Sequence, residues 1–191
     1  MTKGELRKLF LRKRVDLPAA DYFLLNEKIC DHFFEDVDLT GVRVLHTFLP
    51  IEKNREVNTW LIIDRLKLEF PSLRIAVPKI NNQSGLLDNF YFEEAGQLEN
   101  NLWGIPEPKY GVPTPTKEID AVLVPLLACD AMGHRVGYGR GFYDKFLSTC
   151  RPDCRKIGLS FFDVVDKIAG TSENDVRLNL IVTPEKSLVF E

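Results

Sequence analysis

Residues 119–127 read Ile-Asp-Ala-Val-Leu-Val-Pro-Leu-Leu, an almost uninterrupted apolar run. A strand that is buried on both faces, as in a parallel sheet, reads this way because it shows no alternation of apolar and polar residues. We therefore predict a central strand of a parallel sheet here. Further strands are predicted where short β-branched and apolar segments recur, at residues 42–49, 74–78, 90–92, 156–161 and 178–183.

In the segments between these strands, apolar residues recur at the spacing of a helix. Helices are predicted over residues 2–15, 18–34, 58–70 and 141–150. Because strands alternate with helices, the fold class is α/β, with three layers and a largely parallel central sheet. The proline-rich residues 104–118 are predicted to be an extended crossing, and residues 1–191 a single domain.

The composition limits the class of protein. The chain has 191 residues, of which 45% are hydrophobic and 28% charged, and its formal net charge is -3. These values suit one soluble globular domain and argue against a partner that is a nucleic acid. We expect a monomer. No apolar run approaches the roughly 18 residues of a membrane span, and the first residues do not resemble a signal peptide. The expected location is therefore cytoplasmic, with four reduced cysteines and no membrane partner.

The most informative segment is residues 133–144, Gly-His-Arg-Val-Gly-Tyr-Gly-Arg-Gly-Phe-Tyr-Asp. It is predicted to join the buried strand to a helix, at the sheet edge where ligands of α/β proteins bind. Three alternating glycines can turn backbone N–H groups toward one anion, and the helix start and two arginines add positive charge. The spacing matches neither a Walker loop nor a dinucleotide fingerprint. A phosphate site is the favoured interpretation, and a tight strand-to-helix turn is the alternative.

Several charged residues have an ordinary structural interpretation beside a functional one. Asp144 either compensates the helix dipole or holds magnesium against a phosphate. Lys3, Arg7 and Arg14 fall at helical spacing, which by itself indicates a solvated basic face. The three histidines show no metal-ligand spacing, and no Ser-His-Asp or Cys-His arrangement is indicated.

Three other residues carry little signal alone. Glu56 reads as a loop acid and Asp175 as a turn acid. Trp103 reads as a packing residue, although an aromatic side chain in an extended crossing can stack on a flat ligand.

A longer pattern gives these residues a common context. Residues 135–147, Arg-Val-Gly-Tyr-Gly-Arg-Gly-Phe-Tyr-Asp-Lys-Phe-Leu, preceded by Val-Pro-Leu-Leu-Ala-Cys-Asp at 124–130, resemble the signature of the 5-formyltetrahydrofolate cyclo-ligase family. The order and spacing of four other segments agree with it: Lys3-x-x-x-Arg7, Phe48-Leu49 with residues 56–59, Trp-Gly-Ile-Pro-Glu-Pro at 103–108, and residues 173–175. The chain departs from the family pattern at Cys129, Phe142 and Asn179.

The resemblance implies a fold related to ribose-phosphate isomerases and CoA transferases. It also implies that ATP and Mg2+ support the conversion of 5-formyltetrahydrofolate to 5,10-methenyltetrahydrofolate, with release of ADP and phosphate. By this resemblance ATP would contact Lys3, Arg7, Arg135, Val136, Gly137, Tyr138, Gly139, Arg140, Gly141, Phe142 and Tyr143. Magnesium would contact Asp144 and Asp175, and Arg140 and Tyr143 are the predicted catalytic residues. The folate would contact Leu49, Glu56, Trp103 and residues 138–142.

Two other functions stay open from the sequence. A sugar-phosphate isomerase or CoA transferase on the same fold would act without ATP, because fold alone does not fix function. A non-catalytic nucleotide-binding module would bind ATP without turnover.

Overall fold

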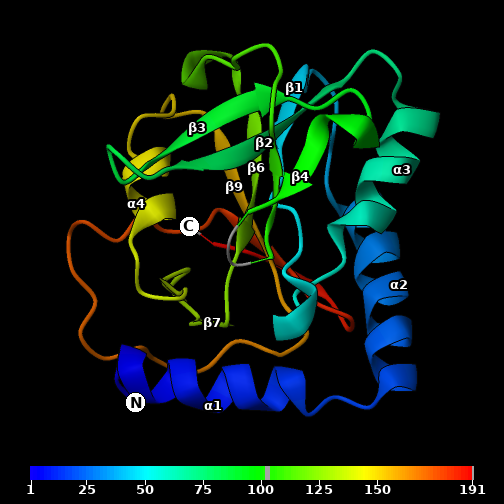
Figure 1. Cartoon of the computed structure of the whole chain (residues 1–191). Helices are drawn as coiled ribbons and strands as arrows, with labels where there is room; N and C mark the ends of the chain where they lie inside the picture. The colour runs from blue at the N-terminus through cyan, green and yellow to red at the C-terminus, as the bar shows by residue number, and fades with distance from the viewer. Residues whose placement is uncertain (102–103, 191) are drawn as a thin grey trace.

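A seven-stranded sheet forms the centre of the protein, with strand order β11-β10-β9-β6-β1-β2-β3 (Figure 1). The computed structural model describes residues 1–101 and 104–190. Five neighbouring strands are parallel, and the two edge strands pair antiparallel. The sheet strands are β1 Val44–His46, β2 Arg74–Asn81, β3 Leu86–Tyr91, β6 Ala121–Pro125, β9 Arg155–Leu159, β10 Leu180–Val182 and β11 Ser187–Val189.

Both faces of this sheet are covered, which confirms the predicted three layers. Leu123 on β6 packs on one face with residues of α2 (Ala19–Asp36) and α3 (Thr59–Glu69). Val122 and Val124 point to the other face, where they meet α4 (Phe142–Leu147). The run over residues 119–127 is apolar throughout because its strand is buried on both sides.

The helix starts follow local sequence signals. Thr2 and Glu5 form a capping box at the start of α1 (Lys3–Val15), and the Asn58 side chain caps α3. α4 is shorter than the predicted helix over residues 141–150. After Leu147 the backbone closes i→i+3 turns, and Pro152 prevents a longer helix.

The predicted strands are present, with different ends. β1 is shorter than residues 42–49, and β2 and β3 extend into a hairpin that the sequence analysis did not predict. The crossing over residues 104–118 is extended as predicted and contains β5 (Pro106–Pro108), which pairs with β4 (Leu98–Asn100). Short 3-10 turns lie at Glu52–Asn54 (η1), Ala95–Gln97 (η2) and Thr116–Glu118 (η3).

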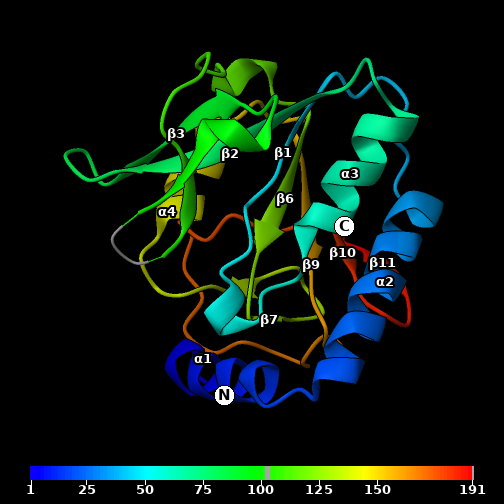
Figure 2. The ribbon, with the colours of Figure 1, turned by 45° about the vertical axis from the view of Figure 1, so that its right-hand side comes forward.

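One topological expectation was wrong. The glycine-rich segment does not follow the central strand directly, because a small hairpin of β7 (Ala128–Cys129) and β8 (Arg135–Val136) lies between β6 and the glycines. Strands of two residues leave no readable periodicity. The hairpin places the glycine-rich loop beside α1 and below the carboxyl end of β6 (Figure 2).

Helix α1 closes this end of the molecule. Leu6 and Phe10 pack with Leu127 and Ile168, and Thr2 forms a parallel bridge with Ala169. The N-terminal helix therefore borders the same edge of the sheet as the glycine-rich loop. None of the helices in the described part of the chain has the length and apolar character needed to cross a membrane.

The buried His46 on β1 gives the fold a testable pH dependence. Burial lowers the pKa of His46 from 6.5 to about 3, although the neighbouring Asn89 acts in the opposite direction. Below pH 6.5 the unfolded chain binds a proton here and the folded chain does not, so stability falls as the pH falls from 6.5 toward 3. Each pH unit in that window costs about 1.4 kcal/mol.

We expect His46→Leu to remove this dependence. Between pH 7 and pH 5 the free energy of unfolding of the wild type should fall by about 2 kcal/mol more than that of the variant. Urea unfolding at both pH values measures the difference. Parallel losses in the two proteins would show that His46 is protonated in the folded state.

Candidate active site

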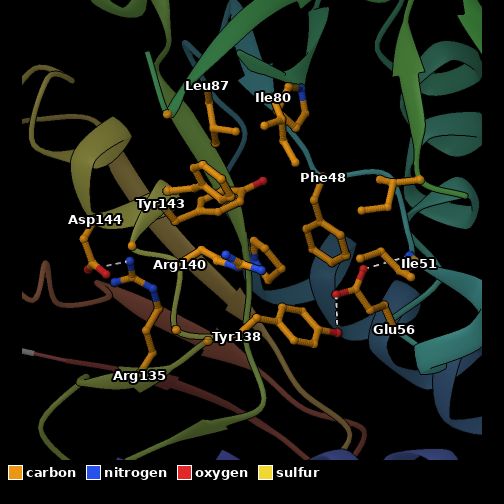
Figure 3. A pocket seen from close by; sticks show the side chains of 18 of the residues that line it. Phe48, Ile51, Glu56, Ile80, Leu87, Arg135, Tyr138, Arg140, Tyr143 and Asp144 are labelled. Atoms are coloured by element: carbon orange, nitrogen blue, oxygen red, sulfur yellow. Dashed lines mark hydrogen bonds and ion pairs between the residues drawn. The ribbon is translucent and has the colours of Figure 1, made fainter. Parts of the chain in front are cut away.

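A cavity of about 700 Å³ lies at the carboxyl ends of the parallel strands. This volume falls in the range of ligand pockets, and the position is the usual one for an α/β sheet. Its walls come from α1, the segments after β1 and β6, the β2–β3 hairpin, the glycine-rich loop and α4. Figure 3 shows Arg140, Tyr138 and Tyr143 in its middle, Arg135 and Asp144 to one side, and Phe48, Ile51 and Glu56 to the other.

The glycine-rich loop depends on two left-handed residues. Gly139 has φ +90° and Gly141 has φ +71°, whereas the φ of Gly137 is not positive, so two of the three glycines need this freedom. A Cβ on Gly139 would lie 3.1 Å from the guanidinium carbon of Arg7. Arg7 also donates from Nε to the Gly137 carbonyl oxygen at 2.8 Å. The loop and α1 thus form one wall of the cavity.

Two ion pairs lie on one side of the cavity, which we call its charged side. Lys3 Nζ contacts Asp175 Oδ2 at 2.5 Å, and the Arg135 guanidinium contacts Asp144 Oδ1 at 2.8 Å. Although burial opposes the change, hydrogen bonds from Lys3 and from the Ser172 amide lower the pKa of Asp175. Lys3 and Asp175, which are 172 positions apart in the sequence, therefore form an ion pair at this side of the cavity.

The two aspartates retain capacity for a cation. Asp144 Oδ1 also accepts from the Val176 amide at 3.2 Å, and Asp175 Oδ2 accepts from the Ser172 amide at 2.6 Å. Their other oxygens, Asp144 Oδ2 and Asp175 Oδ1, accept no hydrogen bond from a described residue. Magnesium beside a nucleotide is typically bound by one or two carboxylates, with phosphates and water completing the octahedron. The donor set fits that ion, and the described residues offer no larger cluster of acidic, His or Cys ligands.

Arg140 and Tyr143 present unpaired polar groups to the cavity. The exposed Arg140 side chain forms no hydrogen bond or ion pair with any described residue, and it projects toward the cavity centre (Figure 3). The buried Tyr143 hydroxyl also lacks a hydrogen-bond partner in the described structure. Burial raises the pKa of Tyr143, so this hydroxyl stays protonated and can donate.

Glu56 holds the opposite side of the cavity among apolar side chains. It is 3% exposed, and burial raises the pKa of its carboxyl above the usual value. The Tyr138 hydroxyl donates to Oε1 at 2.7 Å, and the Ile51 amide donates to Oε2 at 2.8 Å (Figure 3). A buried carboxylate in an apolar wall suits a flat ligand with paired N–H donors.

The structure brings the predicted site residues to this one cavity. Those that line it are Lys3, Arg7, Leu49, Glu56, Arg135, Val136, Gly137, Tyr138, Gly139, Arg140, Gly141, Phe142, Tyr143, Asp144 and Asp175. Trp103 lies outside the described residues. Lys3 and Arg7 do not form the solvated basic face that their spacing alone indicated, because each contacts a distant part of the chain.

Other lining residues were not predicted. They are mostly apolar, and they include Ile51, Pro78, Ile80, Leu87, Ile105 and Pro106. Glu107 is a second buried acid in this wall, and its Oε1 accepts from the Ile80 amide at 3.1 Å. The turn-rich sequence Asn-Asn-Gln-Ser-Gly at residues 81–85 signals the β2–β3 hairpin, but nothing in it indicates that the hairpin covers a cavity.

Comparisons with known proteins identify a family for the chain. The model of the 5-formyltetrahydrofolate cyclo-ligase family matches residues 1–184. The chain is 28% identical to the 5-formyltetrahydrofolate cyclo-ligase of Mycoplasma genitalium over 83% of this chain and 84% of that protein. It is 26% identical to the enzyme of the same name from Mycoplasma pneumoniae, over 97% of this chain and 100% of that protein.

A solved structure shares the fold. The 5,10-methenyltetrahydrofolate synthetase of Aquifex aeolicus superposes with a TM-score of 0.85 at 23% identity, over 100% of this chain and 94% of that one. The family match spans the α1 cations, the glycine-rich loop and the aspartates that line the cavity. The chain therefore belongs to the 5-formyltetrahydrofolate cyclo-ligase family.

Proposed function

We propose that this protein converts 5-formyltetrahydrofolate to 5,10-methenyltetrahydrofolate, with ATP as co-substrate and magnesium as its cofactor, and releases ADP and phosphate. The observation that carries the proposal is the single cavity in which a glycine-rich loop and an unpaired Arg140 lie between a charged side and an apolar side with Glu56. The charged side suits the triphosphate, and the apolar side suits the pterin.

The chemical problem is that a formamide carbon is a poor electrophile and its oxygen a poor leaving group. Transfer of the γ-phosphoryl group from ATP to the formyl oxygen forms one P–O bond and breaks another, with ADP leaving. The neighbouring folate nitrogen then attacks the formyl carbon and loses its proton. The C–O bond breaks as the ring closes, and phosphate carries away the formyl oxygen.

Such a reaction asks the protein for alignment and charge stabilisation rather than for a nucleophile. The loop amides around Gly139 and the Arg140 guanidinium would stabilise charge on the transferring group. The unpartnered Tyr143 hydroxyl would donate a hydrogen bond to an oxygen of the substrates. Lys3 and Arg7 would hold the phosphates of ATP from the α1 side.

Asp144 and Asp175 would hold magnesium. When bound, this ion neutralises phosphate charge and orients the transferring group. The two carboxylates keep a free oxygen each for this purpose, while their other oxygens are fixed by Arg135 and Lys3.

One assay tests the function. The protein is mixed with magnesium, ATP and 5-formyltetrahydrofolate, and absorbance reports the methenyl product. Product that forms only when ATP is present supports the proposal. ATP binding without product would indicate a nucleotide-binding module. Turnover of a sugar phosphate or a CoA thioester without ATP would indicate an isomerase or a transferase.

Asp144→Asn should raise the magnesium concentration needed for half-maximal activity by about tenfold or more, as changes around metal ligands commonly do. The amide removes a negative charge and one metal-facing oxygen. A magnesium titration of the rate measures the effect. Asp163→Asn, which changes an exposed acid that does not line the cavity, serves as the matched control. Superimposable titrations of the wild type and Asp144→Asn would remove Asp144 from the metal site.

A further inference from the structure

Arg14 is a buried cation that does not line the cavity. It lies on the inner face of α1 and is only 4% exposed. Its guanidinium donates to the Asn54 carbonyl oxygen at 2.7 Å and to the Leu126 carbonyl oxygen at 3.3 Å. A third hydrogen bond goes to the hydroxyl oxygen of Tyr138. Arg14 thus holds the segments after β1 and β6 together. Its link to the cavity is the hydrogen bond to Tyr138, whose side chain lines it.

These contacts set the direction of the hydrogen bonds around that phenol. The Tyr138 oxygen accepts from Arg14, and it also accepts from Asn54 Nδ2 at 3.3 Å. Its own hydrogen is therefore left for Glu56 Oε1, 2.7 Å away. Because the Ile51 amide already donates to Oε2, each carboxylate oxygen of Glu56 faces one donor.

This arrangement favours Glu56 as an anion. Both oxygens accept a hydrogen bond, and such bonds are stronger to the ionised carboxylate than to the neutral acid. The carboxylate keeps unused lone pairs on both oxygens, and Glu56 lines the cavity. Those lone pairs can accept two parallel N–H donors, such as those on the amino-pyrimidine edge of a pterin.

Burial and the neighbouring polar groups act on the ionisation of Glu56 in opposite directions. Burial raises the pKa of Glu56, while the Ile51 amide, Arg14 and the Tyr138 hydroxyl lower it. On α4, the charge of Glu56 contributes to raising the pKa of Tyr143, and the Tyr22 hydroxyl of α2 donates to the Glu56 carbonyl oxygen at 2.8 Å. The loop that carries Glu56 also contains three other charged residues, Glu52, Lys53 and Arg55.

We propose that Arg14 is a positioning residue for substrate recognition: acting through the Tyr138 hydroxyl, it holds Glu56 as an ionised acceptor aimed at the paired N–H donors of the folate. The identity of the ligand rests on the proposed function, whereas the coupling of Arg14 to Glu56 is a property of the protein alone. Arg14 is the only one of the three residues that has no direct access to the ligand.

Kinetics test the effect on recognition. Arg14→Met should raise the KM for 5-formyltetrahydrofolate about tenfold or more, and leave kcat and the KM for ATP within about twofold. The acid limb of the pH profile of kcat/KM for the folate should move up by about one pH unit, because a buried anion has lost its nearest cation. Arg14→Lys should restore most of the pH profile. Arg12→Met, on the exposed face of the same helix, should match the wild type.

Carbon-13 NMR tests the coupling without any substrate. In protein labelled at the Glu side-chain carboxyl carbons, the Glu56 signal is assigned from its loss in Glu56→Gln. Its titration midpoint should lie higher by about one pH unit in Arg14→Met. The midpoint should also rise in Tyr138→Phe, which removes the hydrogen bond between the Tyr138 hydroxyl and Glu56 and leaves α1 unchanged.

The two tests separate the two proposals. An unchanged Glu56 titration in Arg14→Met and Tyr138→Phe would overturn the positioning role whatever the enzyme does. A wild type without cyclo-ligase activity would overturn the proposed function. The NMR titration would still show whether Arg14 acts on the ionisation of Glu56 through Tyr138. If Arg14→Met does not fold, Tyr138→Phe gives the same decision, because it removes the hydrogen bond to Glu56 and leaves Arg14 in place.

Discussion

Replacing Arg140 by alanine is expected to lower the rate of a single turnover by about 10³–10⁵-fold, the range found when a cation is removed from a phosphoryl-transfer site. Arg140 has no partner among the described residues, so its charge is free to act on a ligand. It lies between Asp144 on one side of the cavity and Glu56 on the other, where the γ-phosphoryl group would meet the formyl oxygen (Figure 3).

The comparison must separate chemistry from binding. Rapid-quench measurements with saturating ATP and folate report the chemical step, and calorimetry reports the two affinities. Affinity for the folate should change by less than about fivefold, since Arg140 would act on the transferring phosphoryl group while Glu56 would still hold the pterin. Arg140→Lys should retain part of the rate because it keeps the charge without the planar fork. Arg12→Ala is the surface control. A single-turnover rate near that of the wild type in Arg140→Ala would exclude Arg140 from the chemical step.

Glu56→Gln is expected to weaken binding of the folate by about 10–100-fold and to leave ATP binding unchanged. The carboxylate accepts from Tyr138 on one oxygen and from Ile51 on the other. An amide offers one acceptor oxygen, and its NH2 group must then face one of those donors. The variant therefore loses the ionic hydrogen bonds to the ligand and disturbs the two that hold the side chain.

Calorimetric titration with 5-formyltetrahydrofolate and, separately, with ATP measures both affinities. Glu52→Gln changes an exposed acid in the same loop and should bind both ligands like the wild type. An equal loss of affinity for the two ligands in Glu56→Gln would show a general disturbance of the cavity and would exclude a specific contact with the pterin.

The fold could be predicted where the local sequence is unambiguous. The run at residues 119–127 identified a strand buried on both faces, and alternation of strands with helices identified the layers. Features with few residues were missed. β7 and β8 have two residues each, and β11 has three and begins three residues after Pro184. None of these strands is long enough to show the alternation of apolar and polar residues that marks a strand. The end of α4 depends on i→i+3 turns that no composition signal marks.

The site could be predicted where its residues are contiguous. The segment from Arg135 to Asp144 carries glycines, cations and an acid in one readable pattern. Ile80 and Leu87 carry no such signal, because an apolar residue in a hairpin looks the same over a cavity as over a core. Arg14 showed helical spacing with Lys3 and Arg7, but its contact with Tyr138 spans 124 positions and is a product of the tertiary fold.

Segments far apart in the sequence meet at this edge of the sheet, where Thr2 bridges Ala169 and Lys3 contacts Asp175. Because Lys3 and Asp175 are 172 positions apart, α1 can complete this contact only after the intervening polypeptide has been synthesised. A purification tag joined to the residues just before α1 would therefore lie next to Lys3, which lines the cavity.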